Sequence, residues 1–201
     1  MGIPVLILGE SGSGKSTSMR NFDPSELIVF NVANKLMPFR KKLNVINNAN
    51  YDIIGKELQK CEKKVYVIDD SQYLLAFELF NRAKEKGYDK FTDIAVRFEK
   101  MLDYIIKGLP DDCIVYLLHH SETTDTGRVK AKTVGKMLDN QLTVEGLFSI
   151  VLCAYIEDGK HHFMTRSDGF SPAKAPMEMF EPIIDNDLKF VDTTIREYYN
   201  F

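Results

Sequence analysis

Five short, almost wholly apolar runs recur along the chain and constrain its fold more than any other feature. They lack the polar–apolar alternation of a strand with one solvated face, so each is typical of a parallel strand covered on both faces. The runs are residues 3–8, 27–30, 65–68, 114–118 and 150–156. Because such strands need helices on both sides, we predict an α/β fold with a mostly parallel sheet.

Helical and turn patterns fill the segments between these runs. Apolar residues at helical spacing between positions 91 and 105 predict one helix. A second helix is predicted from position 73 to Gly87, with its core-facing stripe at Tyr73, Ala76, Phe77, Phe80 and Ala83. Asp158-Gly159 predicts a tight hairpin, so the last strands should be antiparallel, and residues 187–199 predict a final helix.

Length and charge exclude several classes of protein. The 201 residues suit one domain spanning 1–201, and 26 Lys plus Arg against 29 Asp plus Glu give a net charge of -3, so any basic surface must be local. Cys61, Cys113 and Cys153 are odd in number and widely spaced, which predicts reduced, buried thiols. The longest apolar run is far shorter than the ~18 residues of a membrane span. We therefore expect a cytoplasmic protein without membrane contact.

A glycine-rich segment directly after the first run carries the most specific chemistry. Its sequence GESGSGKS fits the pattern GxxxxGK[ST], in which glycines let backbone amides turn inward around phosphate. Lys15 should reach the β- and γ-phosphates, and the Ser16 hydroxyl should ligate Mg²⁺. The predicted nucleotide-binding residues, called here the glycine-rich loop, are Gly9, Glu10, Ser11, Gly12, Ser13, Gly14, Lys15, Ser16 and Thr17.

Polar residues end two of the other predicted strands. Asp69 is the predicted metal-side carboxylate, on a strand expected to neighbour the first, and Asp70 either polarises the attacking water or caps the next helix. The run 114–118 ends in His119-His120-Ser121-Glu122, where His120 and Glu122 are candidate sensors of the γ-phosphate; either histidine is alternatively structural. His161 and His162 lack Cys or carboxylate at ligand spacing, so zinc is not predicted.

Two basic segments are candidate contacts for partners. Residues 123–136 form a predicted loop that either tracks a nucleic-acid backbone or is a solvated charged loop. Its predicted DNA-binding residues are Arg128, Lys130, Lys132 and Lys136. Arg166 and Lys174 follow the last apolar segment and are candidates to reach the γ-phosphate of a neighbouring subunit.

The sequence also narrows the class of nucleotide-binding protein. Asn34-Lys35-Leu36-Met37 has Met where a guanine-specific loop needs Asp, which disfavours a GTPase. The basic loop lacks the paired arginines of a kinase lid, which leaves RecA-like and AAA-type ATPases as the first hypothesis. A nucleoside or nucleotide kinase and a nucleotide-gated assembly or DNA-packaging ATPase remain as alternatives.

The chain resembles small phage-encoded nucleotide-binding proteins of AAA/RecA type, including the RecA-like phage single-strand annealing proteins. The resemblance rests on segments 9–17, 68–71, 119–122, 133–136 and 165–180. It implies a single RecA-like core that binds ATP with Mg²⁺, forms a homo-oligomer and acts in recombination on single-stranded DNA beside a phage single-strand-binding protein, in the host cytoplasm. One departure is that residues 30–34 lack the acid such enzymes place after the second strand, so hydrolysis should be slow or depend on Asp70 or Glu122.

Overall fold

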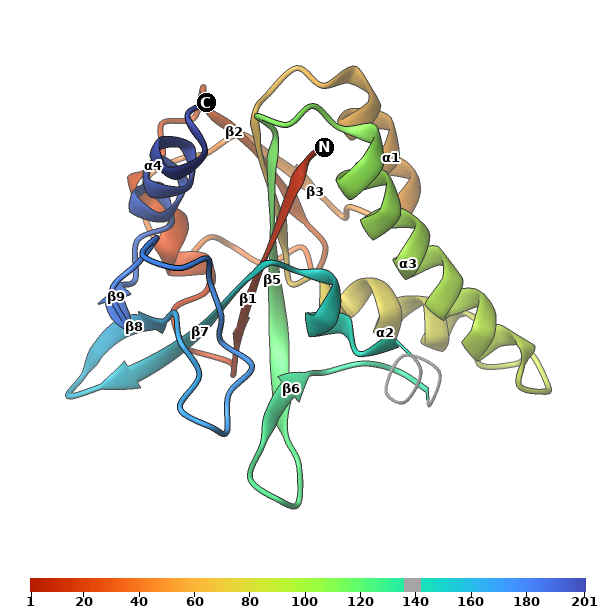
Figure 1. Ribbon diagram of the computed structural model, residues 1–201. Helices are drawn as coiled ribbons and strands as arrows, with labels where there is room; N and C mark the ends of the chain where they lie inside the picture. The colour runs from red at the N-terminus through yellow and green to blue at the C-terminus, as the bar shows by residue number, and fades with distance from the viewer. Residues whose placement is uncertain (136–141) are drawn as a thin grey trace.

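The computed structural model describes residues 1–135 and 142–201, and it has an α/β architecture (Figure 1). The predicted strands, the helix around residues 91–105, the hairpin at Asp158-Gly159 and the final helix are all present. The elements are β1 (Ile3–Gly9), η1 (Ser16–Asn21), β2 (Leu27–Asn31), β3 (Val45–Asn47), α1 (Tyr51–Lys60), β4 (Val65–Asp69), α2 (Gln72–Asn81), α3 (Asp89–Gly108), β5 (Ile114–Thr123), β6 (Val129–Ala131), η3 (Val144–Leu147), β7 (Ile150–Glu157), β8 (Lys160–Met164), β9 (Ile183–Asp185) and α4 (Leu188–Tyr199).

A nine-stranded sheet forms the centre of the molecule, with the order β3-β2-β4-β5-β1-β7-β8-β9 and β6 paired to β5. Strands β3, β2, β4, β5, β1 and β7 are mutually parallel, whereas β8, β9 and β6 pair antiparallel to their neighbours. The parallel strands therefore end along one edge of the sheet, where the loops that follow β1, β4 and β5 meet.

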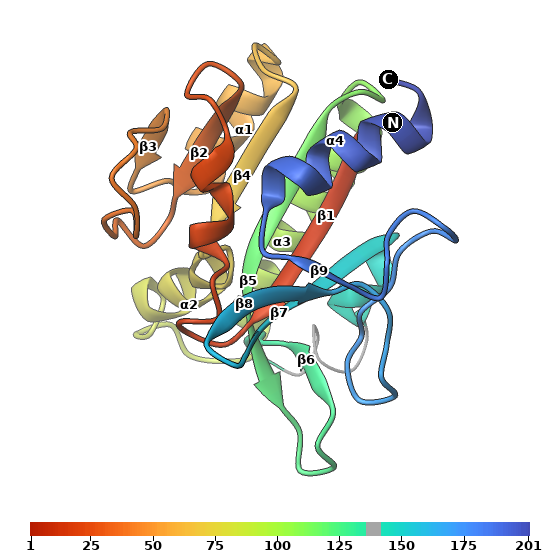
Figure 2. The ribbon, with the colours of Figure 1, turned by 90° about the vertical axis from the view of Figure 1, so that its left-hand side faces the viewer.

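Helices cover both faces of the sheet, as the apolar runs predict. Helices α1, α2 and α3 pack on one face and bury side chains such as Ile54, Leu75 and Phe98. On the other face, η1 and α4 bury Met19 and Val191 (Figure 2). Because each strand is enclosed on both sides, nearly every side chain of β1, β2 and β4 is buried, and alternation disappears from their sequences.

Three local expectations need correction. Helix α2 ends at Asn81, not at Gly87, and buries Leu74 and Leu75, whereas Phe80 of the predicted core stripe is 75% exposed. The predicted basic loop begins as a β5–β6 hairpin, which projects from the strand-end edge (Figure 1). All three cysteines are free, but only Cys113 is fully buried.

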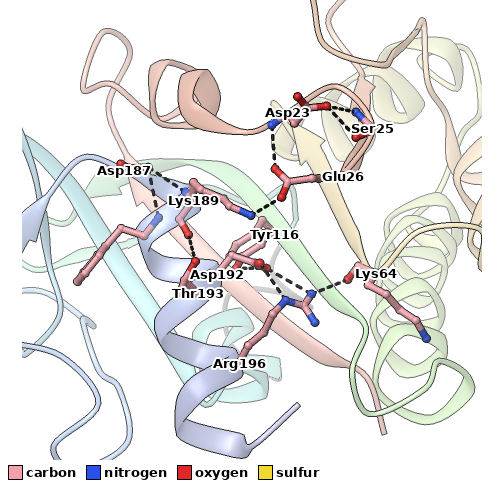
Figure 3. Close-up of polar contacts among 11 residues, drawn as sticks. Asp23, Ser25, Glu26, Lys64, Tyr116, Asp187, Lys189, Asp192, Thr193 and Arg196 are labelled. Atoms are coloured by element: carbon pink, nitrogen blue, oxygen red, sulfur yellow. Dashed lines mark hydrogen bonds and ion pairs between the residues drawn. The ribbon is translucent and has the colours of Figure 1, made fainter.

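A polar network holds α4 against the opposite edge, where β4 and β5 begin (Figure 3). The buried Asp192 carboxylate accepts hydrogen bonds from Tyr116 Oη at 3.1 Å and Arg196 Nε at 2.9 Å. Arg196 also donates to the carbonyl oxygens of Asp112 and Lys64, so one guanidinium joins α4 to the chain just before two strands. Figures 1 and 2 place both chain termini near this edge.

Among the described residues, no helix combines the length and apolar character that crossing a bilayer requires.

Candidate functional site

The glycine-rich loop encloses the Lys15 side chain. Gly12 and Gly14 have φ values of 83° and 97°, in the region that glycine adopts readily, which lets the backbone turn sharply around the lysine. Lys15 Nζ donates to the carbonyl oxygens of Gly9 at 2.8 Å and Glu10 at 2.7 Å. Burial lowers the pKa of Lys15 to about 8, although the charges of nearby carboxylates partly offset this effect. The loop thus presents a buried ammonium group that lacks a direct anionic partner among the described contacts.

Asp69 lies at the end of β4 and contacts the glycine-rich loop directly. Ser16 Oγ donates to Asp69 Oδ1 at 2.8 Å, so the predicted metal-binding pair is assembled. The prediction that their strands are neighbours is wrong, because β5 lies between β1 and β4. Asp69 is 4% exposed, and burial is the main cause that raises its pKa to about 6. A hydroxyl and a carboxylate are the hard oxygen donors that Mg²⁺ prefers, so the donor set fits that ion.

Asp70 follows β4 in a left-handed conformation, with φ of 60°. Its Oδ1 lies 3.1 Å from His120 Nε2 and its Oδ2 lies 2.7 Å from Lys35 Nζ. Burial alone would raise the pKa of Asp70, but the hydrogen bonds from His120 and Lys35 outweigh it and the net pKa is lowered. The structure therefore brings Asp70 and His120 together, and the carboxylate bonds to these side chains instead of capping α2.

His119, the neighbour of His120, is a structural residue. Its ring is fully buried and contacts Ser71 Oγ and the Lys132 carbonyl oxygen, both at 2.9 Å. Burial lowers its pKa to about 4, so the ring is neutral at physiological pH. The two adjacent histidines on β5 thus differ in environment, since only His120 reaches the carboxylate at the strand-end edge.

These groups surround a cavity of about 210 Å³. Its lining combines the glycine-rich loop, both aspartates and the loop after β2, and consists of Ser11, Gly12, Gly14, Lys15, Ser16, Thr17, Lys35, Leu36, Pro38, Asp69, Asp70 and His120. The role of Lys35 here was missed by the sequence analysis, which considered it only as part of a guanine-binding motif. The signal that could have found it is a lysine a few residues beyond the end of a predicted parallel strand, at the edge where Asp69 and Lys15 were expected.

A second missed contact supports the glycine-rich loop from the antiparallel end of the sheet. A Cβ atom placed on Gly14 would lie 2.8 Å from His161 Nδ1 and 3.2 Å from Asn186 Nδ2, so only glycine fits here. Arg20 donates to the Asn186 carbonyl oxygen at 2.5 Å and ties the following 3-10 helix to the same segment. The turn between β9 and α4 therefore helps to fix the loop position.

Other predicted site residues lie outside this cavity. Glu122 faces Lys130 across the β5–β6 hairpin, with their charged atoms 2.9 Å apart, and does not line the cavity. Arg166 donates to the Phe180 carbonyl oxygen, and Lys174 is exposed while its backbone pairs with Val151. The prediction that Arg166 or Lys174 acts on a neighbouring subunit stays a prediction.

The candidate DNA-binding residues cluster only in part. Arg128 is exposed near the hairpin tip, Lys130 lies on β6, and Lys132 follows that strand. Lys136 lies outside the described residues. The hairpin continues β5, the strand that carries His120, so the basic residues and the cavity belong to the same edge of the sheet.

A comparison of the chain with family models and with curated proteins found no match in either set.

Proposed function

We propose that the protein binds ATP with Mg²⁺ in the 210 Å³ cavity and hydrolyses it. The observation that carries this proposal is the 2.8 Å hydrogen bond between Ser16 Oγ and Asp69 Oδ1. It joins the end of a phosphate-binding type of loop to a buried carboxylate across an intervening strand. In P-loop nucleotide-hydrolysing proteins, a hydroxyl from the loop and a carboxylate from a strand end hold the nucleotide-bound magnesium ion.

The glycine-rich loop would hold the phosphates. Its backbone amides and the Lys15 ammonium group provide the positive partial and full charges that a triphosphate requires. Lys15 Nζ bonds the carbonyls of Gly9 and Glu10 in the contacts described, and phosphate oxygens would be stronger, charged acceptors. Nucleotide binding should therefore raise the lowered pKa of Lys15.

Asp70, whose Oδ1 is held by His120 Nε2, would act at the terminal phosphate. Mg²⁺ held by Ser16 and Asp69 would neutralise charge that develops on the phosphate oxygens. The Asp70 carboxylate accepts a hydrogen bond from a water molecule, whose oxygen forms a bond to the γ-phosphorus while the bond to the bridging oxygen breaks. The water proton leaves through Asp70, and the products are ADP and inorganic phosphate.

Calorimetric titration with ATP in the presence of Mg²⁺ tests the binding step. Wild-type protein should bind ATP, and Lys15→Ala should not. Lys42→Gln, an exposed lysine that does not line the cavity, is the matched control and should bind normally. Wild-type protein that fails to bind ATP would contradict the proposal.

We further propose a RecA-like assembly that acts on single-stranded DNA. Support comes from the antiparallel strands β8 and β9, which RecA-like ATPases share, and from the basic residues of the β5–β6 hairpin, which lies at the same strand-end edge of the sheet as the cavity. Together, Arg128→Gln, Lys130→Gln and Lys132→Gln should weaken binding to single strands and flatten its dependence on salt. Unchanged affinity would remove DNA binding from this hairpin.

Assays of turnover separate the alternatives. A hydrolysis rate that rises with single-stranded DNA supports a RecA-like ATPase that acts on single strands. A rate that does not change with DNA favours an assembly or packaging ATPase. Transfer of phosphate to a nucleoside or nucleotide would identify a kinase instead.

A further inference from the structure

Lys35 is a cation in the cavity to which the proposed function assigns no role. We propose that Lys35 is a second phosphate-binding lysine, which leaves Asp70 and contacts the terminal phosphate of a bound triphosphate within the same chain. This inference rests on the proposed function and extends it by naming the residue that distinguishes ATP from ADP.

The position of Lys35 supports this role. It lines the same cavity as the glycine-rich loop, together with Asp69, Asp70 and His120. Lys15 belongs to the glycine-rich loop after β1, and Lys35 belongs to the loop after β2. Strands β4 and β5 lie between β1 and β2 in the sheet. A triphosphate held by the glycine-rich loop and Lys15, with its γ-phosphate toward Asp70, would thus meet Lys35 at that terminal phosphate.

The Lys35 backbone is fixed by a buried side chain. Asn31, at the end of β2 and 1% exposed, donates from Nδ2 to the Lys35 carbonyl oxygen at 2.7 Å. Its Oδ1 accepts from the Lys35 amide at 3.2 Å, and its Nδ2 also donates to Asn47 Oδ1 at 2.8 Å. These bonds satisfy a buried amide and at the same time hold one backbone segment from both sides. Lys35 is therefore held at its main chain, whereas its side chain can move.

The Lys35 ammonium group contacts a carboxylate and an aromatic ring, and it can leave both for a phosphate. Nζ lies 2.7 Å from Asp70 Oδ2 and 5.1 Å from the centre of the Tyr73 ring. The Lys35 side chain is 55% exposed and that of Asp70 is 8% exposed, so water screens this ion pair from the lysine side. A terminal phosphate carries more charge than a carboxylate, so the ammonium group gains by moving from Asp70 to the phosphate.

Movement of the Lys35 ammonium group from Asp70 to the phosphate would also improve the charge balance in the cavity. Asp69 and Asp70 place two carboxylates beside the predicted position of a highly negative ligand. Lysine residues in the described lining are limited to Lys15 and Lys35, so movement of Lys35 to the phosphate supplies an attraction that ADP cannot use. The same movement frees Asp70 Oδ2 to accept a hydrogen bond from the attacking water.

Affinities for ATP and ADP, measured separately in Mg²⁺, test the proposal. Lys35→Gln should weaken ATP binding about tenfold or more and leave ADP binding within about twofold, because ADP lacks the γ-phosphate. Lys35→Arg keeps the charge and should restore most of the preference for ATP. Lys42→Gln controls for loss of a surface charge, and thermal unfolding confirms that each variant is folded.

The outcomes separate this inference from the proposed function. If Lys35→Gln weakens ATP and ADP equally, or changes neither, while wild type binds both, Lys35 is not a γ-phosphate ligand and only the inference is overturned. If wild type binds neither nucleotide, the proposed function is overturned and the inference with it.

Discussion

Buried aspartates lie both where the parallel strands begin and where they end, and Asp192 on α4 differs from Asp69 on β4 in what surrounds it. Asp192 is 2% exposed and receives hydrogen bonds from Tyr116 and from the charged guanidinium of Arg196. Asp69 is 4% exposed and receives one from the neutral Ser16 hydroxyl, while the nearby Lys15 ammonium group bonds to backbone carbonyls. Buried charge needs compensation. The chain itself supplies it at Asp192, whereas at Asp69 the proposed metal ion would supply it.

The difference fits a structural role for Asp192 and the metal-binding role proposed for Asp69. Arg196 links Asp192 to two carbonyls just before β4 and β5, which fixes α4 and gives the buried carboxylate a charged partner from the chain itself (Figure 3). At the other end, burial raises the pKa of Asp69 to about 6 and lowers that of Lys15 to about 8. Groups whose charged forms are disfavoured in the free protein gain most when an ion and a phosphate arrive.

The largest expected effect is at the structural end. Asp192→Ala leaves the Arg196 guanidinium and the Tyr116 hydroxyl without their carboxylate partner, and should lower the free energy of unfolding by about 3 to 5 kcal/mol. Urea denaturation measures this loss. ATP affinity of the folded fraction should be unchanged, and a variant that keeps full stability would end the contrast between the two aspartates.

The dependence of the free energy of unfolding on pH tests the environment of His119, both of whose ring nitrogens have hydrogen-bond partners. Because its pKa is about 4 in the folded protein against 6.5 when unfolded, the unfolded chain binds the proton first. The contribution of neutral His119 is therefore complete above pH 6.5 and is lost as pH falls toward 4, by up to about 3 kcal/mol. His119→Asn should remove this part of the slope; identical slopes in both proteins would show that His119 does not titrate as described.

At the proposed nucleotide site, Lys15→Met should separate the effect on ATP binding from the effect on stability. Losing the phosphate-contacting ammonium should weaken ATP binding at least about 100-fold, or about 2.7 kcal/mol. Stability should stay constant or rise, since burial of this charge is unfavourable in the free protein. Calorimetry and thermal unfolding on the same sample provide both values, and a large loss of stability would argue for a structural Lys15.

The smallest effect is expected for Asp69→Asn. At pH 8 the wild-type carboxylate is ionised despite burial, and its raised pKa corresponds to a cost of up to about 3 kcal/mol. The neutral amide should recover only part of this cost, because it is a weaker acceptor for the Ser16 hydroxyl than the ionised carboxylate. The dependence of ATP affinity on Mg²⁺ should disappear in the same variant. If Asp69→Asn lowers the free energy of unfolding and leaves the Mg²⁺ dependence of ATP affinity unchanged, the metal ion binds elsewhere.

The sequence predicted the parts of the molecule that local pattern determines. Strands such as β1 and β4 could be recognised because both of their faces are buried, and GESGSGKS marks the glycine-rich loop without tertiary information. The pairing of Asp69 with Ser16 was also predicted, although the intervening β5 was not. Strand order depends on long-range contacts that a linear pattern does not contain.

Other features lie beyond such patterns for physical reasons. Strands β3 and β9 have three residues each, too few to show a period. In α2 the aromatic side chains suggested the buried face, but tertiary packing buries Gln72, Leu74 and Leu75 instead. The contact of Lys35 with Asp70 joins positions separated by β3, α1 and β4, and only the folded sheet brings them together.

The placement of both termini near the edge where β4 and β5 begin has a practical use. A tag, a fluorophore or a surface anchor fused to either end would be attached on the side away from the glycine-rich loop (Figures 1 and 2). Immobilised protein would thereby keep its cavity open to solution.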